Sequence, residues 1–194
     1  MMKISFSGIT GCGKTSLLTE VKKILLLKYK VESIDKISQK NPFDEDKKLN
    51  FISQFYFLSN QINEENTKSI AFPDILLCDG SVLDLWVLWK KYTSQVEISD
   101  QIKEKNNILE NLYKYWVKTY NLTFFIRTSL IEYEKREIQN EFRKIDINYL
   151  QKTEEIYTRT IEENKLNVIE IWNNSSIDEG AQKILKFITE FHKE

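Results

Sequence analysis

The chain has 194 residues, of which 41% are hydrophobic and 29% charged, a composition typical of one folded domain and not of a disordered segment. Its 28 basic and 29 acidic residues give a formal net charge of -1, so no nucleic-acid or anionic-membrane partner is expected. Two cysteines and one histidine argue against a structural zinc site, a disulfide framework and a histidine-dependent nucleophile. No apolar run approaches the ~20 residues of a membrane span and no signal-peptide pattern opens the chain, so we expect a cytoplasmic protein.

Short β-rich runs alternate with long amphipathic stretches. We predict strands over residues 3–7, 31–35, 75–79, 122–127 and 167–171, and helices over 14–28, 47–68, 81–93, 99–120, 130–139, 146–164 and 177–192. Strands separated by helices require right-handed crossovers, which predicts a single α/β domain with a five-stranded parallel sheet covered by helices on both faces. In such a sheet a ligand lies beyond the carboxyl ends of the strands, so the polar residues there are candidate site residues.

A phosphate-binding loop follows the first predicted strand. Residues 8–15 read Gly-Ile-Thr-Gly-Cys-Gly-Lys-Thr, which satisfies the pattern G-x-x-x-x-G-K-S/T between a strand and a helix. Its glycines let backbone N–H groups surround a phosphate, and the helix that follows adds its N-terminal dipole. The alternative is a glycine-rich turn that matches by chance. The residues expected to bind ATP are Gly8, Thr10, Gly11, Cys12, Gly13, Lys14, Thr15 and Ser16.

Asp79 ends the third predicted strand and is the candidate second half of the nucleotide site. A carboxylate at this position would face Mg²⁺ together with the Thr15 hydroxyl, which makes Thr15 and Asp79 the expected metal ligands. The competing interpretation is a helix N-cap, because Asp79 and Ser81 both precede a helical run.

Two subclasses of phosphate-loop protein do not fit the sequence. Guanine-specific GTPases carry Asp-x-x-Gly after a strand and an Asn-Lys-x-Asp motif, and neither is present in that context. Ring ATPases have a second acidic residue after the strand-end aspartate, where this chain has Gly80, and an added helical domain for which no residues remain. A small phosphotransferase that uses ATP and Mg²⁺ is the remaining hypothesis.

Several segments resemble the deoxynucleoside kinase and thymidylate kinase group, from residue 3 to about residue 160. The run 51–58 is similar to the family segment F-x-x-Q-x-Y-x-L, and 41–43 to its Asn-Pro after the second strand. Residues 79–81 resemble D/E-R-S, and 125–129 resemble L-R-T-S. Residues 147–150, followed by Tyr157, resemble the helix after the family lid. Small P-loop kinases of the ribosylnicotinamide kinase type share the same skeleton.

The resemblance implies an acceptor site and a short helical lid at about 128–145. In the family the glutamine at the position of Gln54 pairs with the base edge; Phe51 and Trp86 would flank the acceptor. Arg136 and Arg143 resemble the lid arginines that close over the transferred phosphate, and only four arginines occur in the chain. The alternatives are core packing for the aromatic residues and a solvated helix face for the arginines.

The sequence also departs from the family pattern at two positions. Gly80 replaces the arginine of D/E-R-S, which argues against an acceptor that already carries a phosphate. The family's catalytic glutamate has no clean counterpart: Asp35 is the nearest candidate, Glu32 an alternative, and Lys36 stands at the more literal position.

These observations predict a P-loop kinase whose catalytic residues are Lys14, Asp35, Asp79, Arg136 and Arg143. ATP would be the co-substrate, Mg²⁺ the cofactor, and a nucleoside or nucleoside monophosphate the acceptor. The resemblance implies a homodimer. Two other hypotheses stay open: a nucleotide-dependent switch that acts on a protein partner, and a degenerate kinase kept as a scaffold.

Overall fold

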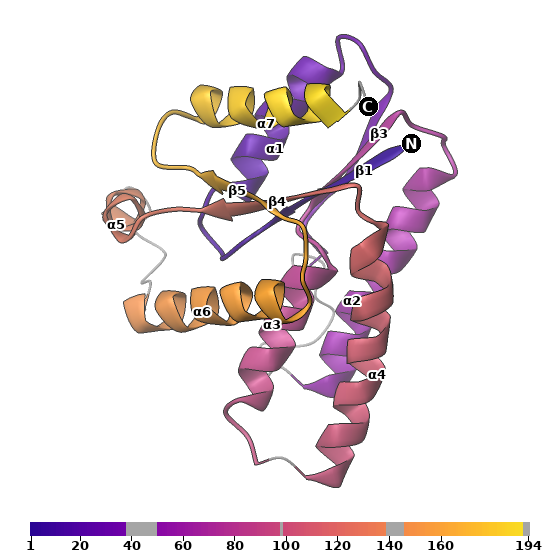
Figure 1. Ribbon diagram of the computed structural model, residues 1–194, viewed down its shortest axis with the longest axis vertical. Coiled ribbons are helices and arrows are strands. Elements are labelled where there is room, and N and C mark those ends of the chain that lie inside the picture. Colours follow the sequence, from indigo (N-terminus) through magenta and orange to yellow (C-terminus); the bar gives the residue numbers. More distant parts are fainter. Residues whose placement is uncertain (38–49, 98, 139–145, 192–194) are drawn as a thin grey trace.

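The computed structural model describes residues 1–37, 50–97, 99–138 and 146–191. Its five strands form one parallel sheet in the order β2-β3-β1-β4-β5 (Figure 1). The strands are β1 (Met2–Ser7), β2 (Val31–Ile34), β3 (Ile75–Asp79), β4 (Leu122–Arg127) and β5 (Ile169–Trp172). The predicted fold class is confirmed, and every predicted strand is present, although β5 begins at Ile169 and not at residue 167.

Helices cover both faces of the sheet. They are α1 (Lys14–Leu25), α2 (Phe51–Ser69), α3 (Val82–Thr93), α4 (Asp100–Trp116), α5 (Leu130–Ile138), α6 (Ile147–Glu163) and α7 (Ile177–Phe191), with the short 3-10 helix η2 at Val117–Thr119. Helices α1 and α7 pack on one face and α2, α3, α4 and α6 on the other, while α5 lies beyond the end of β4 (Figure 1). Across the described ranges, no helix is both long and apolar enough to cross a membrane.

Side-chain caps place the helix starts that matter for the site. Ser81 caps α3 by accepting a hydrogen bond from the backbone N–H of Leu83, and Asp84 completes a capping box with the N–H of Ser81. Asn50 and Ser53 form the corresponding box at the start of α2. Ser81, and not Asp79, is therefore the N-cap of α3, which leaves the Asp79 side chain for another role.

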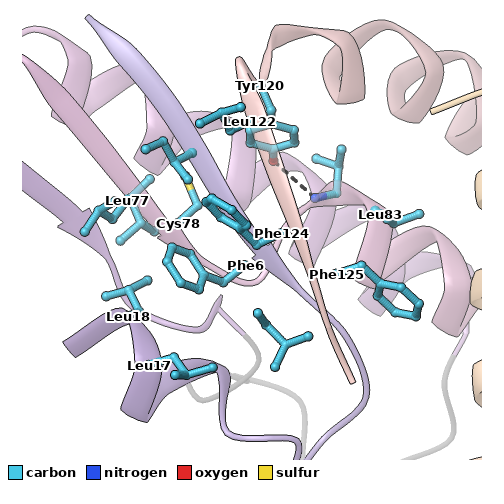
Figure 2. Packing of buried hydrophobic residues seen from close by; sticks show 14 of the residues in the cluster. Phe6, Leu17, Leu18, Leu77, Cys78, Leu83, Tyr120, Leu122, Phe124 and Phe125 are labelled. Carbon is cyan, nitrogen blue, oxygen red and sulfur yellow. Dashed lines mark hydrogen bonds between the residues drawn. The ribbon is translucent and has the colours of Figure 1, made fainter. Parts of the chain in front are cut away.

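The core lies on both sides of the two central strands. All residues of β1 and β3 are buried, as expected for parallel strands that are covered on both faces. Phe6 of β1 packs against Phe124 of β4 with ring centroids 5.6 Å apart (Figure 2). Beside them, the Tyr120 hydroxyl accepts a hydrogen bond from the backbone N–H of Val82, which fixes the start of α3 to the core (Figure 2).

A buried ion pair joins the start of the sheet to α2. Lys3 Nζ lies 2.8 Å from Glu65 Oε2, and both side chains are almost fully buried. The Glu65 carboxylate also accepts hydrogen bonds from Trp116 Nε1, the Tyr120 hydroxyl and Gln61 Nε2. Each oxygen thus has two donors, which is the arrangement that lets a buried charge be tolerated.

Candidate functional site

The phosphate-binding loop connects β1 to α1 and closes tightly at its glycines. Gly13 caps α1 in the left-handed region, with φ = 93°, and a Cβ atom there would collide with Asn173 Nδ2. The buried Lys14 ammonium donates to the carbonyl oxygens of Gly8 at 2.5 Å and Ile9 at 2.9 Å. Lys14 therefore lies inside the curve of the loop, where a bound phosphate would compete for the same ammonium group.

One carbonyl fixes the second half of this loop. Cys12 O accepts hydrogen bonds from Thr128 Oγ1 at 3.1 Å, Asn173 Nδ2 at 2.8 Å and Arg136 Nη1 at 3.3 Å. Thr128 follows β4, Asn173 follows β5, and Arg136 lies in α5. Because a trans peptide points its C=O and N–H in opposite directions, holding this carbonyl also fixes the direction of the Gly13 N–H. The sequence analysis did not identify Asn173, since nothing in its local sequence marks it.

Thr15 and Asp79 meet at the edge of the sheet. The Thr15 hydroxyl donates to Asp79 Oδ2 at 2.6 Å, whereas Asp79 Oδ1 is buried and has no hydrogen-bond partner in the described structure. Burial raises the pKa of the Asp79 carboxyl, and the Thr15 hydrogen bond and the charges of Lys14 and Lys36 act against this rise.

This pair fits the Mg²⁺ that the fold implies. A carboxylate oxygen without a partner and a neighbouring hydroxyl are hard oxygen ligands of the kind Mg²⁺ uses, together with phosphate oxygens and waters. No cluster of three or more His, Cys, Asp or Glu side chains that could hold a metal occurs among the described residues.

A cavity of about 570 Å³, counting the part open to solvent, lies beside the phosphate loop. The loop contributes one wall, Ser81 and Leu85 of the α3 region a second, and Thr153 of α6 a third. Its remaining lining residues are Gly8, Ile9, Thr10, Lys14, Lys36, Ile37, Gln61, Asp79, Gly80, Asp84, Leu88, Tyr149 and Tyr157.

Asp84 holds the start of the phosphate loop against α3 and α6. Its Oδ1 accepts from the Gly8 N–H at 2.8 Å and from the Tyr157 hydroxyl at 2.5 Å, and its Oδ2 accepts from the Ser81 N–H at 2.6 Å. Burial, together with the Asp84 charge, raises the pKa of the Tyr157 phenol well above its usual value. Asp84 was missed by the sequence analysis, although its place three residues after the capping Ser81 is a signal for a capping box.

The structure does not bring the predicted base or acceptor residues to this cavity. Asp35 is exposed and does not line it, because β2 ends at the buried Ile34 and the chain turns Lys36 and Ile37 to the cavity instead. Gln54 is buried between α2 and α3, where its Nε2 donates to Leu85 O.

The aromatic candidates also lie away from the cavity. Trp86 is stacked on Tyr113 with centroids 5.2 Å apart, and Phe51 packs edge-on against Trp89 at 6.2 Å. Gln54 and Trp86 share a small internal cavity of about 160 Å³ that is separate from the one beside the phosphate loop. Gln61, two turns further along the same face of α2, lines the larger cavity in their place.

Of the two lid arginines, Arg136 belongs to the described structure and Arg143 does not. Arg136 donates to Cys12 O and Asn173 O, so it bridges the phosphate loop and the segment after β5. In the same helix the Tyr133 hydroxyl donates to Thr10 O at 3.3 Å. Helix α5 therefore packs directly on the loop. Residues 41–43, and residues 139–145 of the predicted lid, also lie outside the described ranges.

Comparisons with solved structures agree with this architecture. A deoxyadenosine kinase from M. mycoides with bound dCTP superposes with a TM-score of 0.71 at 17% identity, covering 97% of this chain and 100% of the other. A thymidylate kinase from Ehrlichia chaffeensis gives 0.64 at 16% identity, with 96% and 98% covered. The YorR protein of Bacillus subtilis, in complex with phosphorylated GDP, gives 0.55 at 15% identity, with 100% and 99% covered. At these identities the likeness shows a shared fold.

Sequence comparisons give the family. No curated protein matches significantly, but the model of a family described as an AAA domain matches residues 3–179. In this chain the residue after Asp79 is Gly80, whereas a ring ATPase has a second acidic residue at that position. The solved structures that share the fold include two nucleoside or nucleotide kinases. The chain belongs to this AAA domain family and has the P-loop fold of the deoxynucleoside and thymidylate kinases.

Proposed function

We propose that the protein is an ATP- and Mg²⁺-dependent phosphotransferase that transfers the γ-phosphoryl group to a nucleoside or a nucleoside monophosphate. The observation that carries this proposal is the position of the cavity. It shares Gly8, Lys14 and Asp79 with the nucleotide site, so an acceptor bound there lies next to the phosphates. Simple hydrolysis of ATP uses water as the phosphoryl acceptor and needs no cavity for a second substrate.

The chain's own groups would act mainly by position and charge. The loop backbone surrounds the donor phosphates, and Lys14 exchanges its two carbonyl partners for phosphate oxygens. Mg²⁺, held by Thr15 and Asp79, would neutralise charge that develops on the phosphates. Arg136 keeps the loop in shape through Cys12 O, and we propose that residues 128–145 act as the lid.

A nucleotide-dependent switch is the second candidate. The Gly8 N–H donates to Asp84, and the hydroxyl of Tyr157 in α6 donates to Gly8 O at 3.1 Å. A change in the conformation of the loop would therefore alter contacts with α6 directly. Such a protein would hydrolyse ATP slowly without any acceptor and would change conformation when ATP binds. Homodimerisation and a cytoplasmic location stay predictions.

The test is ADP release from Mg-ATP with a panel of nucleosides, deoxynucleosides, their monophosphates and nicotinamide riboside. Lys14→Ala should lower the rate at least about a hundredfold, because it removes a preorganised positive charge from the transition state. Lys22→Ala is the matched control, since Lys22 lies in the same helix and bonds Ser33 outside the site. One acceptor that raises the rate far above the acceptor-free rate supports a kinase, and a flat panel above the Lys14→Ala rate supports the switch.

A further inference from the structure

The charges around the cavity distinguish between two kinds of acceptor. A hydroxyl acceptor needs a group that takes its proton, whereas a phosphate oxygen is already ionised at neutral pH and needs cations instead. We infer that the acceptor already carries a phosphate, as a nucleoside monophosphate does, and that Lys36 binds this phosphate. The inference rests on the proposed function and names the substrate class of the same site.

The first argument concerns the carboxylates. Among the described residues that line the cavity, only Asp79 and Asp84 are acidic. Asp84 accepts three hydrogen bonds, including two from backbone N–H groups that need an acceptor, so it is occupied in holding the loop. Asp79 is bonded to Thr15 and is the group that fits Mg²⁺. Neither carboxylate is available to remove a proton from a hydroxyl.

The second argument concerns the cations. Lys14 and Lys36 both line the cavity, and Lys36 lies close enough to Asp79 to oppose the rise in pKa that burial causes there. The side chain of Lys36 is half-buried. The segment that carries it is anchored in the core by Ile34 and Ile37, which are 2% and 3% exposed. A cation is thus held beside the point of transfer by the end of β2.

The third argument explains why this cation does not come from residue 80. Gly80 has φ = 94°, a conformation that residues with side chains rarely adopt, and a Cβ atom there would lie 3.4 Å from Asp84 Oδ2. The backbone conformation that precedes the Ser81–Asp84 capping box therefore disfavours a side chain at position 80. Lys36 supplies the positive charge from the neighbouring strand, and the absence of arginine at 80 no longer argues against a phosphorylated acceptor.

The chemical step balances without a base. An oxygen of the acceptor phosphate attacks the γ-phosphorus of ATP, and the bond from that phosphorus to the β–γ bridging oxygen breaks. The electron pair of this bond leaves with ADP, and the acceptor becomes a diphosphate. Because a phosphomonoester has a second pKa of about 6, the attacking oxygen is ionised at pH 7.5 and no proton has to be removed from it.

The experiment compares the four 2′-deoxynucleosides with their 5′-monophosphates, at pH 7.5 with Mg-ATP, in the wild-type protein and three variants. In wild type, a monophosphate should be used with kcat/KM at least about tenfold above that of its nucleoside. Lys36→Met should raise the KM for that monophosphate about tenfold or more, since it removes a charge-assisted hydrogen bond. Lys186→Met, on the exposed side of α7, is the matched control and should change nothing. Lys36→Glu should lower the monophosphate-to-nucleoside preference further than Lys36→Met.

Equilibrium binding separates this inference from the proposed function. Titration calorimetry with the same eight compounds, in the presence of Mg-ADP, needs no turnover. The inference is supported if a monophosphate binds more tightly than its nucleoside, and if this difference is lost in Lys36→Met and kept in Lys186→Met. This holds even if no compound is phosphorylated, in which case only the proposed kinase activity fails. A nucleoside that binds or reacts as well as its monophosphate, or a Lys36→Met protein that binds the monophosphate like wild type, would overturn the inference while a kinase could still stand.

Discussion

Thr15 and Asp79, which are 64 residues apart in the chain, are joined by a hydrogen bond of 2.6 Å from the Thr15 hydroxyl to Asp79 Oδ2. The contact exists because β1 and β3 are neighbours in register, with Phe6 opposite Asp79, so that the loop after β1 begins beside the end of β3. The second oxygen of Asp79 has no partner among the described residues. The site thus holds a buried carboxylate with one oxygen that no described protein group contacts by a hydrogen bond.

Asp79→Asn should therefore stabilise the ligand-free protein while it abolishes turnover. Burial raises the pKa of Asp79 in the folded state, so the stability that its protonated form provides is present below pH 3.8 and is lost as the pH rises through the folded-state pKa. Asparagine is neutral at every pH. We expect a gain of about 1 kcal/mol at pH 7, or ~2–4 °C in Tm, and a smaller gain towards pH 4.

Thermal unfolding of both proteins between pH 4 and 8, without nucleotide or Mg²⁺, measures this difference. An Asp79→Asn protein that is less stable than wild type at pH 7 would show that the carboxylate is well solvated or paired, and would remove the argument for a metal site made from its unpartnered oxygen.

Asp84→Ala should destabilise the fold and slow the reaction together. The substitution leaves the N–H groups of Gly8 and Ser81 without their acceptor and removes the capping box of α3, at a cost of about 2–3 kcal/mol. Tyr157→Phe removes one donor to the same carboxylate and the hydroxyl contact with Gly8 O, leaves both backbone N–H groups with their acceptor, and should cost about 1 kcal/mol.

Urea unfolding and ADP-release kinetics of the two variants check this order. If Asp84→Ala kept the wild-type stability but lost most of kcat, then Asp84 would not be holding the loop, and its carboxylate would again be a candidate for proton transfer. If it kept both, Asp84 would have neither role.

Gln54→Met and Gln61→Met form a matched pair in α2. Gln54→Met loses a hydrogen bond to Leu85 O but also removes a buried Oε1 without a partner, so the net change in stability should stay within about 1 kcal/mol, and the acceptor KM should not change. Gln61 lines the cavity, so Gln61→Met should raise the acceptor KM several-fold.

Steady-state kinetics with the acceptor identified by the panel give both values of KM. A rise in KM confined to Gln54→Met would restore the role that the family resemblance implies for Gln54, and it would mean that α2 moves when an acceptor binds.

Glu65→Gln should be among the most destabilising single changes in the molecule. It leaves the buried Lys3 ammonium without a counter-charge and turns an amide N–H₂ towards groups that are themselves donors, at a cost of about 3–5 kcal/mol. The exposed pair Lys103–Asp100 provides the control, since Asp100→Asn should have no measurable effect on stability. Equal midpoints of urea unfolding for the two variants would contradict this account of the Glu65 network.

Local sequence determined much of this protein. The alternation of apolar strands with amphipathic stretches predicted the five strands and seven α-helices that the described residues form, because burial on both faces of a parallel sheet demands long apolar runs and helical crossovers. The phosphate loop and Asp79 were also predictable, since each depends on residue types at fixed places after a strand. The resemblance of residues 51–58 correctly marked a helix, but it did not show which of its turns would meet the cavity.

Only the tertiary structure decided how the site is completed. Asp35 and Lys36 are adjacent in the sequence, and Lys36 lines the cavity while Asp35 does not, because the buried Ile34 and Ile37 set the course of the chain between them. The same holds for Gln54 and Gln61 on α2, and for Asn173, whose contact with Cys12 O spans 161 residues. Periodicity specifies which elements form, because it reflects contacts within one segment. The direction of a single side chain at the junction of several elements is set by packing between segments, which no local pattern contains.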